Sequence, residues 1–274
     1  SVTIPGSVED WDYAFYNCSG LKSAEINKGV TNIGSSAFRN CTALASVIIP
    51  EGVTSIGSYA FEDCGELTSV TIPGSVEDWD YAFYNCSGLE SVEINKGVTN
   101  IGDSAFQNCT SLASATIPEG VTGIGNYAFS GCSLISNITI PEGVTIIGNY
   151  AFEDCDALSS VIIPGSVEDW DYAFYNCSGL QSVEIKEGVA SIFSNTFYNC
   201  MSLISVKIPE SVKIIEDHAF DGFSALSNVI IPEGVMYIGQ YAFRGCYALE
   251  SITIPVSVIS IGSYAFYNCK ELNS

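Results

Sequence analysis

The sequence contains a single histidine, His218, and only 9 lysine and arginine residues against 31 aspartate and glutamate residues. With one histidine, a Ser-His-Asp or Cys-His catalytic device could exist only beside His218. The excess of carboxylates gives a formal net charge of −22. Because such a surface repels phosphate backbones and anionic lipid head groups, it argues against nucleic acid and peripheral membrane binding, and it mildly favours cationic partners or divalent ions.

Long hydrophobic runs are also missing. No apolar segment approaches the roughly 20 residues that a membrane-spanning helix needs, so we expect no membrane insertion. Apolar residues nevertheless make up 47% of the chain. An extensive core must therefore lie beneath an acidic surface.

One repeated motif fills the chain. A repeat of only 22 or 23 residues cannot bury an apolar face alone, so the copies must stack on one another as a solenoid. We expect one array over residues 1–274 with no internal boundary, incomplete at both ends because the last copy stops at Leu272 before its strand. The motif is marked by twelve phenylalanines in steps of 22 or 23 residues: Phe15, Phe38, Phe61, Phe83, Phe106, Phe129, Phe152, Phe174, Phe197, Phe220, Phe243 and Phe266.

A short strand is predicted after each phenylalanine. The residue eleven places on is always isoleucine where the copy reaches it, and the residue two places before that is Val, Ile or Ala. Apolar residues at this spacing predict a strand that sends both side chains inward. All nine prolines directly follow one of the isoleucines, where they end the strand. Because the chain returns to the same edge at a constant period, the strands must be parallel.

A helical turn is expected on the other side of the coil. The position three before Phe is Ser, Asp or Asn in eleven of twelve copies, as at a helix N-cap, and Asp12, Asp80 and Asp171 are interpreted as such caps. The position two after Phe is always Asn, Asp or Gly, which tolerate the left-handed backbone that ends helices. The residues between predict a one-turn helix.

Three copies are one residue shorter and share the segment PGSVEDWDYAFYNCSGL, at 5–21, 73–89 and 164–180. In these copies Trp11, Trp79 and Trp170 take the place of a core isoleucine, and the glycine that usually follows is missing. We therefore expect a tighter connection there. Elsewhere Phe193 and Glu216 occupy the glycine slot, so this slot does not require a positive φ.

The eleven cysteines follow the same period, three places after Phe, and Phe223 holds the twelfth slot. Phenylalanine can replace a small buried apolar residue, but it cannot replace a thiolate metal ligand or half of a disulfide. Neighbouring thiols in stacked coils also have near-parallel directions that suit disulfide torsion poorly. The pattern predicts a row of buried free thiols and no metal site.

The full pattern, L-x-x-V-x-I-P-x-x-V-x-x-I-G-x-x-A-F-x-x-C, resembles the BspA-like leucine-rich repeat family across the whole chain, and residues 51–73 show it well. The resemblance implies an α/β repeat solenoid. Its expected form is a right-handed leucine-rich repeat coil with a parallel sheet on the concave side and short one-turn helices on the convex side. It also implies a secreted or surface-attached protein that serves adhesion or protein binding, without a cofactor.

A partner is expected on the outward face of the sheet, where an array offers many equivalent positions. Eight places after Phe the residue is Ser or Asn, and ten places after Phe it varies between copies, as a recognition surface or unselected drift would produce. A rival surface is the row of tyrosines one place after Phe, at Tyr16, Tyr84, Tyr175, Tyr198 and Tyr267. The predicted partner-binding residues, called the binding row below, are Ser69, Thr71, Ser91, Glu93, Ser114, Thr116, Asn137, Thr139, Ser160, Ile162, Ser182 and Glu184.

The sequence gives little support for a catalytic role of the carboxylates. Equivalent acidic turns lack the unequal environments that split two carboxylates into an acid and a base, so a glycosidase is disfavoured. Weak calcium binding by the EDWD segments stays open, since oxygen ligands are plentiful although no loop has coordinating spacing. His218 takes a slot that is tyrosine in eight copies, which indicates a packed ring.

The sequence thus predicts a non-enzymatic adhesion or protein-binding module located outside the cell or at its surface. Its partner would be a protein or glycan of a host or neighbouring cell. The alternative is a structural spacer or a self-assembling extracellular fibre, because exposed strand edges at both ends would allow head-to-tail self-association.

Overall fold

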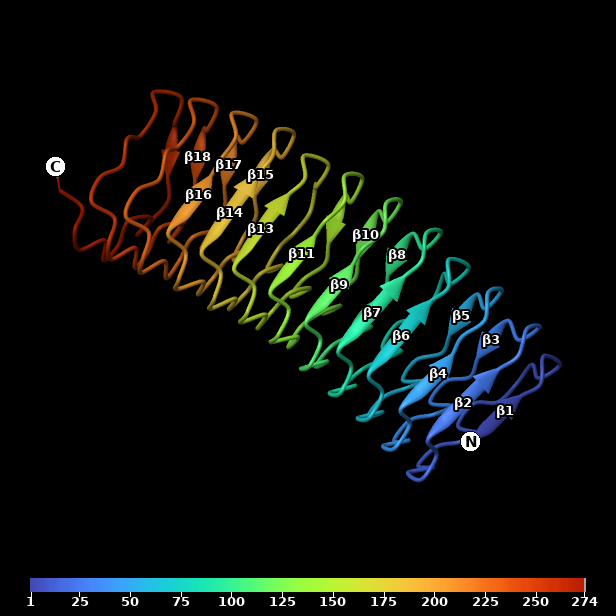
Figure 1. The fold of residues 1–274 in the computed structure, drawn as a ribbon. Helices are drawn as coiled ribbons and strands as arrows, with labels where there is room; N and C mark the ends of the chain where they lie inside the picture. The colour runs from blue at the N-terminus through green and yellow to red at the C-terminus, as the bar shows by residue number, and fades with distance from the viewer. Residues whose placement is uncertain (274) are drawn as a thin grey trace.

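The computed structural model describes residues 1–273 and shows a long coil in which each turn of chain repeats the one before (Figure 1). The chain termini lie at opposite ends of the coil, and the longer strands line one side with shorter strands behind them. Strand pairing is parallel throughout, as predicted, and joins residues about one repeat apart, such as Val70 with Val92. The handedness of the coil and the concavity of its sheet stay predictions.

The longer strands form the main sheet, which is divided into blocks β1-β2-β4, β6-β7-β9-β11 and β13-β14-β16. Most of these strands bury alternate residues, which confirms the predicted inward Val and Ile positions; in β16 the inward Val206 is only partly buried. The strands are β1 (Val2–Ile4), β2 (Ser23–Ile26), β4 (Ser46–Ile48), β6 (Ser69–Ile72), β7 (Ser91–Ile94), β9 (Ser114–Thr116), β11 (Asn137–Thr139), β13 (Ser160–Ile163), β14 (Ser182–Ile185) and β16 (Ser205–Lys207).

Two-residue strands form a second ladder, just before the turn that carries each phenylalanine. The second residue of each strand is an isoleucine that is buried in the core, except for Ile261 of the last one, which is exposed. They are β3 (Asn32–Ile33), β5 (Ser55–Ile56), β8 (Asn100–Ile101), β10 (Gly123–Ile124), β12 (Ile146–Ile147), β15 (Ser191–Ile192), β17 (Ile214–Ile215), β18 (Tyr237–Ile238) and β19 (Ser260–Ile261).

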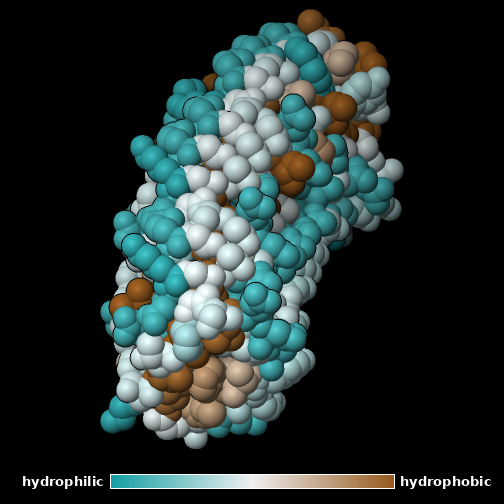
Figure 2. Space-filling model, turned by 90° about the vertical axis from the view of Figure 1, so that its right-hand side faces the viewer, coloured by the Kyte–Doolittle hydropathy of each residue, from teal (hydrophilic) through white to brown (hydrophobic). Residues whose placement is uncertain are grey.

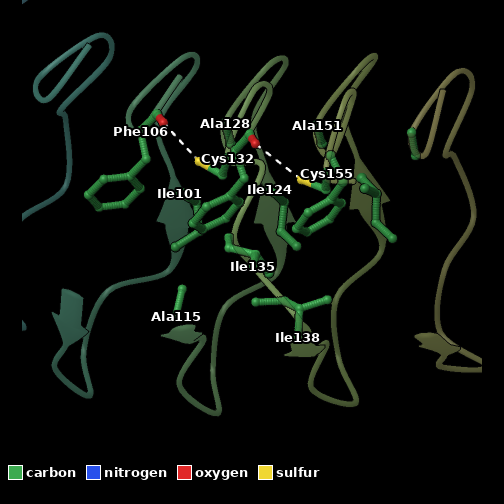
Figure 3. Close-up of a cluster of buried hydrophobic side chains, with 14 of the residues drawn as sticks. Ile101, Phe106, Ala115, Ile124, Ala128, Cys132, Ile135, Ile138, Ala151 and Cys155 are labelled. Carbon is green, nitrogen blue, oxygen red and sulfur yellow. Dashed lines mark hydrogen bonds between the residues drawn. The ribbon is translucent and has the colours of Figure 1, made fainter. Parts of the chain in front are cut away.

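The core consists of stacks of equivalent side chains that run along the coil. The rings of Phe106, Phe129 and Phe152 are fully buried and stack with centroid distances of 5.5 and 5.4 Å. The Cys132 thiol donates to the Phe106 carbonyl oxygen at 3.2 Å, and the next coil repeats this contact (Figure 3). All eleven cysteines are free and nine are buried, which confirms the predicted thiol row. Burying each phenylalanine contributes about 1.5–3 kcal/mol to stability.

The predicted one-turn helices are wrong: residues 1–273 contain no helix. Around Phe129 the backbone N–H groups of Tyr127, Phe129 and Gly131 donate to carbonyls of the next coil at 2.8–2.9 Å, so they are not available for helical bonds. Left-handed backbone on both sides of the phenylalanine, at φ 56° for Tyr127 and 73° for Gly131, also prevents a helical run. The left-handed position after Phe was predicted, whereas the one at tyrosine was not.

Of the three predicted N-caps, Asp12 and Asp80 bond instead to the following coil, whereas the buried Asp171 Oδ1 has no hydrogen-bond partner among residues 1–273. Asp12 Oδ1 accepts from the backbone N–H of Ser35 at 2.6 Å, and Asp80 Oδ1 accepts from that of Asp103 at 2.7 Å. These side chains satisfy orphan donors, as a cap does, but the donors belong to the neighbouring turn. Each coil is therefore tied to the next by side chains as well as by backbone.

Two of the three short copies lie at breaks of the main sheet, since β6 and β13 each lead into one and neither pairs with the strand before it. In the copy after β6, the Ser75 hydroxyl accepts from Gly52 N–H at 3.0 Å and donates to the Val53 carbonyl at 2.7 Å. Trp79 is buried as predicted, and its Nε1–H donates to the Asn100 carbonyl at 3.0 Å. A serine bridge on one side and an anchored indole on the other thus connect the short copy to its neighbours.

Gly74→Ala in a short copy is expected to destabilise the protein by about 1–3 kcal/mol, because a Cβ there would overlap the Lys96 carbonyl oxygen of the next coil. Gly20→Ala is the matched control, since a Cβ at Gly20 meets nothing within 4 Å. Urea unfolding followed by circular dichroism measures both. Equal stability of the two variants would show that the coils can separate at Gly74 without cost.

Candidate functional site

The binding row lies on the outer face of the main sheet, as predicted. Its residues are exposed except Ser182 and Glu184, which are half-buried. Strand register places Thr71 beside Glu93 and Glu93 beside Thr116. The residues from Ser69 to Thr139 share the four-stranded block β6-β7-β9-β11, whereas those from Ser160 to Glu184 lie on the next block, beyond the break between β11 and β13.

The two glutamates of the row differ in electrostatic state. Glu184 lies 3.0 Å from Lys186 Nζ and 2.8 Å from Lys207 Nζ, and the hydrogen bonds from these lysines lower the pKa of its carboxyl group. No lysine or arginine among residues 1–273 forms an ion pair with Glu93. Glu93, flanked by two threonine hydroxyls, is therefore the carboxylate of the row that is open to a partner.

The rival tyrosine row does not form one continuous exposed surface. Tyr175 and Tyr198 stack on each other at 5.0 Å and are half-buried, and Tyr84 packs edge-on against Tyr59. Of this row, Tyr16 and Tyr267 alone are exposed. The tyrosines act mainly as packing between turns.

His218 is packed as predicted, since its ring stacks on Tyr241 at 4.9 Å. Its Nδ1 lies 2.7 Å from Asp221 Oδ2, and Arg244 Nε lies 2.8 Å from the other Asp221 oxygen. Within residues 1–273 no serine or cysteine hydrogen-bonds to the His218 ring, and no three His, Cys, Asp or Glu side chains are grouped as a metal site would require. The geometry around the histidine is that of a structural ion network.

A groove along the flank of the coil was not anticipated from the sequence. It consists of hollows of about 410, 350 and 440 Å³ where a glycine follows the second ladder. A Cβ at Gly57, for example, would lie 2.5 Å from Ser35 N, so the glycine slot reflects close approach of the coils, and its φ is not positive, as predicted. Asp80 lines the groove, and burial raises the pKa of its carboxyl group. Its bond to the next coil gives this carboxylate a structural role.

The outer surface is polar along most of its length. Figure 2 shows a face on which hydrophilic residues and residues of intermediate hydropathy cover most of the length, while hydrophobic residues gather at its lower end and again at its upper right. None of the described residues belongs to a helix that could cross a membrane.

Comparison with known proteins matches this geometry. A family model described as a BspA type Leucine rich repeat region, in six copies, matches residues 11–81, 79–171 and 170–273. A leucine-rich repeat protein from Bacteroides ovatus has a solved structure with 29% identity and a TM-score of 0.70, covering 99% of this chain and 85% of that chain. A leucine rich cell surface protein from Faecalibacterium prausnitzii shows 34% identity and a TM-score of 0.56, covering 99% of this chain and 86% of that chain. No curated protein sequence matches significantly.

Proposed function

The chain belongs to the BspA-type leucine-rich repeat family, a class of protein-interaction scaffolds, and from that premise we propose that it is an adhesion module of a secreted or cell-surface protein. The proposed partner is a protein or glycan of a host or neighbouring cell. The solved relative from Faecalibacterium prausnitzii, described as a cell surface protein, supports an extracellular or surface location.

The observation that carries the proposal is the contrast between a constant frame and a variable outer row. Ser69, Ser91 and Ser114 lie side by side in register, while the residues two places further on change from Thr71 to Glu93 to Thr116. The parallel pairing holds these side chains at the spacing of adjacent strands, about 4.8 Å. A rigid, exposed row whose chemistry differs from coil to coil can specify one partner without any change in the core.

The proposal is tested with the triple variant Thr71→Ala, Glu93→Ala and Thr116→Ala. Binding of the unaltered chain is first sought on a panel of extracellular-matrix proteins and on a glycan array. The triple variant is then expected to bind the identified ligand at least about tenfold more weakly, because about 1.4 kcal/mol is lost when several central contacts are removed. Surface plasmon resonance measures the difference.

The matched control changes the exposed residues Thr42, Glu66 and Thr110 to alanine, away from the main sheet. It should bind as the unaltered chain does. Equal weakening in both variants would place the contact elsewhere. Absence of any ligand together with concentration-dependent association in light scattering would favour the self-assembling fibre instead.

A further inference from the structure

One junction in the coil differs from the others. The rings of Phe197 and Phe220 are 6.3 Å apart, whereas the neighbouring pairs along the stack are separated by 5.6 and 5.1 Å. Larger side chains occupy the slots around this junction, where Phe193 replaces a glycine, Thr196 an alanine and Phe223 a cysteine. Close-packed interiors accept added volume only by displacement, so these residues hold the two coils apart.

The main sheet opens at the same place. β16 is its last strand, and residues 228–231, which follow it by one repeat, do not pair with it. Val206 and Ile208 are consequently half-exposed, although their counterparts Val183 and Ile185 in the preceding coil are buried. Backbone groups that elsewhere bond between strands are left open to solvent or to a partner along this edge.

The opening forms a cleft on the outer face of the sheet. Two adjoining cavities of about 400 and 270 Å³ share the residues Asn228, Val229 and Ile230. Ile204 and Ile230 stand at the cleft with 57% and 76% of their surface exposed. Exposed isoleucines beside partly uncovered core residues are a feature of docking surfaces, because they gain most from losing contact with water.

Negative charge predominates around the cleft. Glu210 and Glu233 line the second cavity, and no lysine or arginine lines it in the described part of the chain. Lys207 lines the first cavity, but its ammonium group is bound to Glu184 at 2.8 Å. The cleft therefore combines apolar walls with two carboxylates that have no ion-pair partner among residues 1–273.

We propose that this cleft, lined by Ile204, Val206, Val229, Ile230 and Glu233, binds an extended peptide segment of a partner protein that carries bulky apolar side chains next to a lysine or arginine. The apolar side chains enter between β16 and residues 228–231, and the cation lies at Glu210 and Glu233. Open main-chain groups of residues 228–231 offer hydrogen bonds to the peptide backbone, as a strand edge does. The cleft lies outside the binding row, so its occupation does not require the row to bind anything.

The test uses a fluorescein-labelled peptide, Ser-Leu-Phe-Lys-Ser, and fluorescence anisotropy. Ile230→Asp should weaken binding by at least about tenfold, since burial of the apolar anchor is lost. Ile48→Asp is the matched control, because Ile48 occupies the same slot on a paired strand with 64% of its surface exposed and the substitution adds the same charge. This control should bind within about twofold of the unaltered chain, a difference too small to reflect a lost anchor.

Two further peptides separate the contribution of the apolar side chains to binding from that of the lysine. Replacing Leu-Phe by Ser-Ser, or Lys by Glu, should each abolish binding to the unaltered chain, and Glu210→Gln with Glu233→Gln should weaken binding of Ser-Leu-Phe-Lys-Ser. Failure of the unaltered chain to bind Ser-Leu-Phe-Lys-Ser, or equal binding by Ile230→Asp, overturns the proposal. Self-association in analytical ultracentrifugation that Ile230→Asp removes also overturns it, because the occupant would then be a second copy of the chain.

Discussion

Above about pH 8.5 the free energy of unfolding is expected to fall steeply with pH, by about 1.4 kcal/mol per pH unit for each buried thiol that unfolding exposes. Burial raises the pKa of Cys86, Cys109, Cys132 and Cys177 well above its ordinary value. It raises the pKa of Cys41, nearer one end of the row, only to about 11. Because these thiols lie in one continuous core, each of them affects the free energy of unfolding of the same coil.

The direction of this pH dependence follows from the number of protons that the folded and the unfolded chain bind. Below about pH 8 the thiols keep their protons in both the folded and the unfolded chain, so stability does not depend on them. At higher pH the unfolded chain ionises while the folded chain, with its raised pKa, stays protonated. The unfolded state then binds fewer protons, and stability is lost as pH rises towards the folded-state pKa.

Urea unfolding between about pH 8 and 9.5 in reducing buffer measures the effect, below the range in which tyrosine ionises. The double variant Cys109→Ala and Cys132→Ala is the control, since it removes two titrating groups. Its stability should be lower throughout, but it should fall with a slope shallower by about 1.7 kcal/mol per pH unit on average over this range, because a thiol of pKa about 8.5 is only partly ionised there in the unfolded chain. A stability that is flat with pH in the unaltered chain would show that the thiols are hydrated.

Phe129→Ala is expected to cost about 3–5 kcal/mol of stability. The ring is fully buried and is stacked on both sides, at 5.5 Å from Phe106 and 5.4 Å from Phe152. Backbone bonds of Phe129 and Ala128 to neighbouring residues hold the turn in place, which limits how far the coils can collapse into the space. A cavity in the middle of the stack also weakens the contact between the coils on its two sides.

The same urea measurement tests this variant, with Ile48→Ala as the control. Ile48 is 64% exposed, so its truncation should change stability by no more than about 0.5 kcal/mol. A small loss for Phe129→Ala, similar to that of Ile48→Ala, would mean that the stack relaxes and closes over the missing ring.

The core could be predicted from the sequence because most copies place the same apolar residue in each of its slots. Phe, Ile and Cys at fixed places predicted the stacks and the row of buried thiols, and the replacement of one cysteine by Phe223 argued against a metal or disulfide role. The same regularity predicted parallel strands, an outward binding row and the packed ring of His218. Repetition serves here as a substitute for comparison between relatives.

The helices were predicted wrongly because local signals do not say which backbone a group will bond to. Aspartate three places before Phe has the chemistry of a cap, but its acceptor oxygen reaches the N–H of the next coil, as at Asp103 to Asn126 at 2.7 Å. Nothing in the sequence indicated the left-handed backbone at Tyr127 and its equivalents, since tyrosine rarely adopts this conformation. A dense bonding network between coils stabilises that conformation.

The flank groove and the cleft were missed for a different reason. Both depend on the distance between consecutive coils, which is set by the fit of side chains in three dimensions. The replacements at Phe193, Thr196 and Phe223 were visible as departures from the pattern, and together they could have marked the junction. Their effect on the sheet could be seen only in the structure.

The three short copies provide a way to change the length of the coil. Because residues 5–21, 73–89 and 164–180 are identical, removing the block 5–72 or 73–163 would rejoin the chain through the same turn, with the same tryptophan anchor and nearly the same neighbours. Recombination between such stretches would lengthen or shorten the molecule by several coils at once while creating no unfamiliar interface. Chains related by such an exchange would differ in length by whole blocks of coils and would keep the same core and the same contacts between coils.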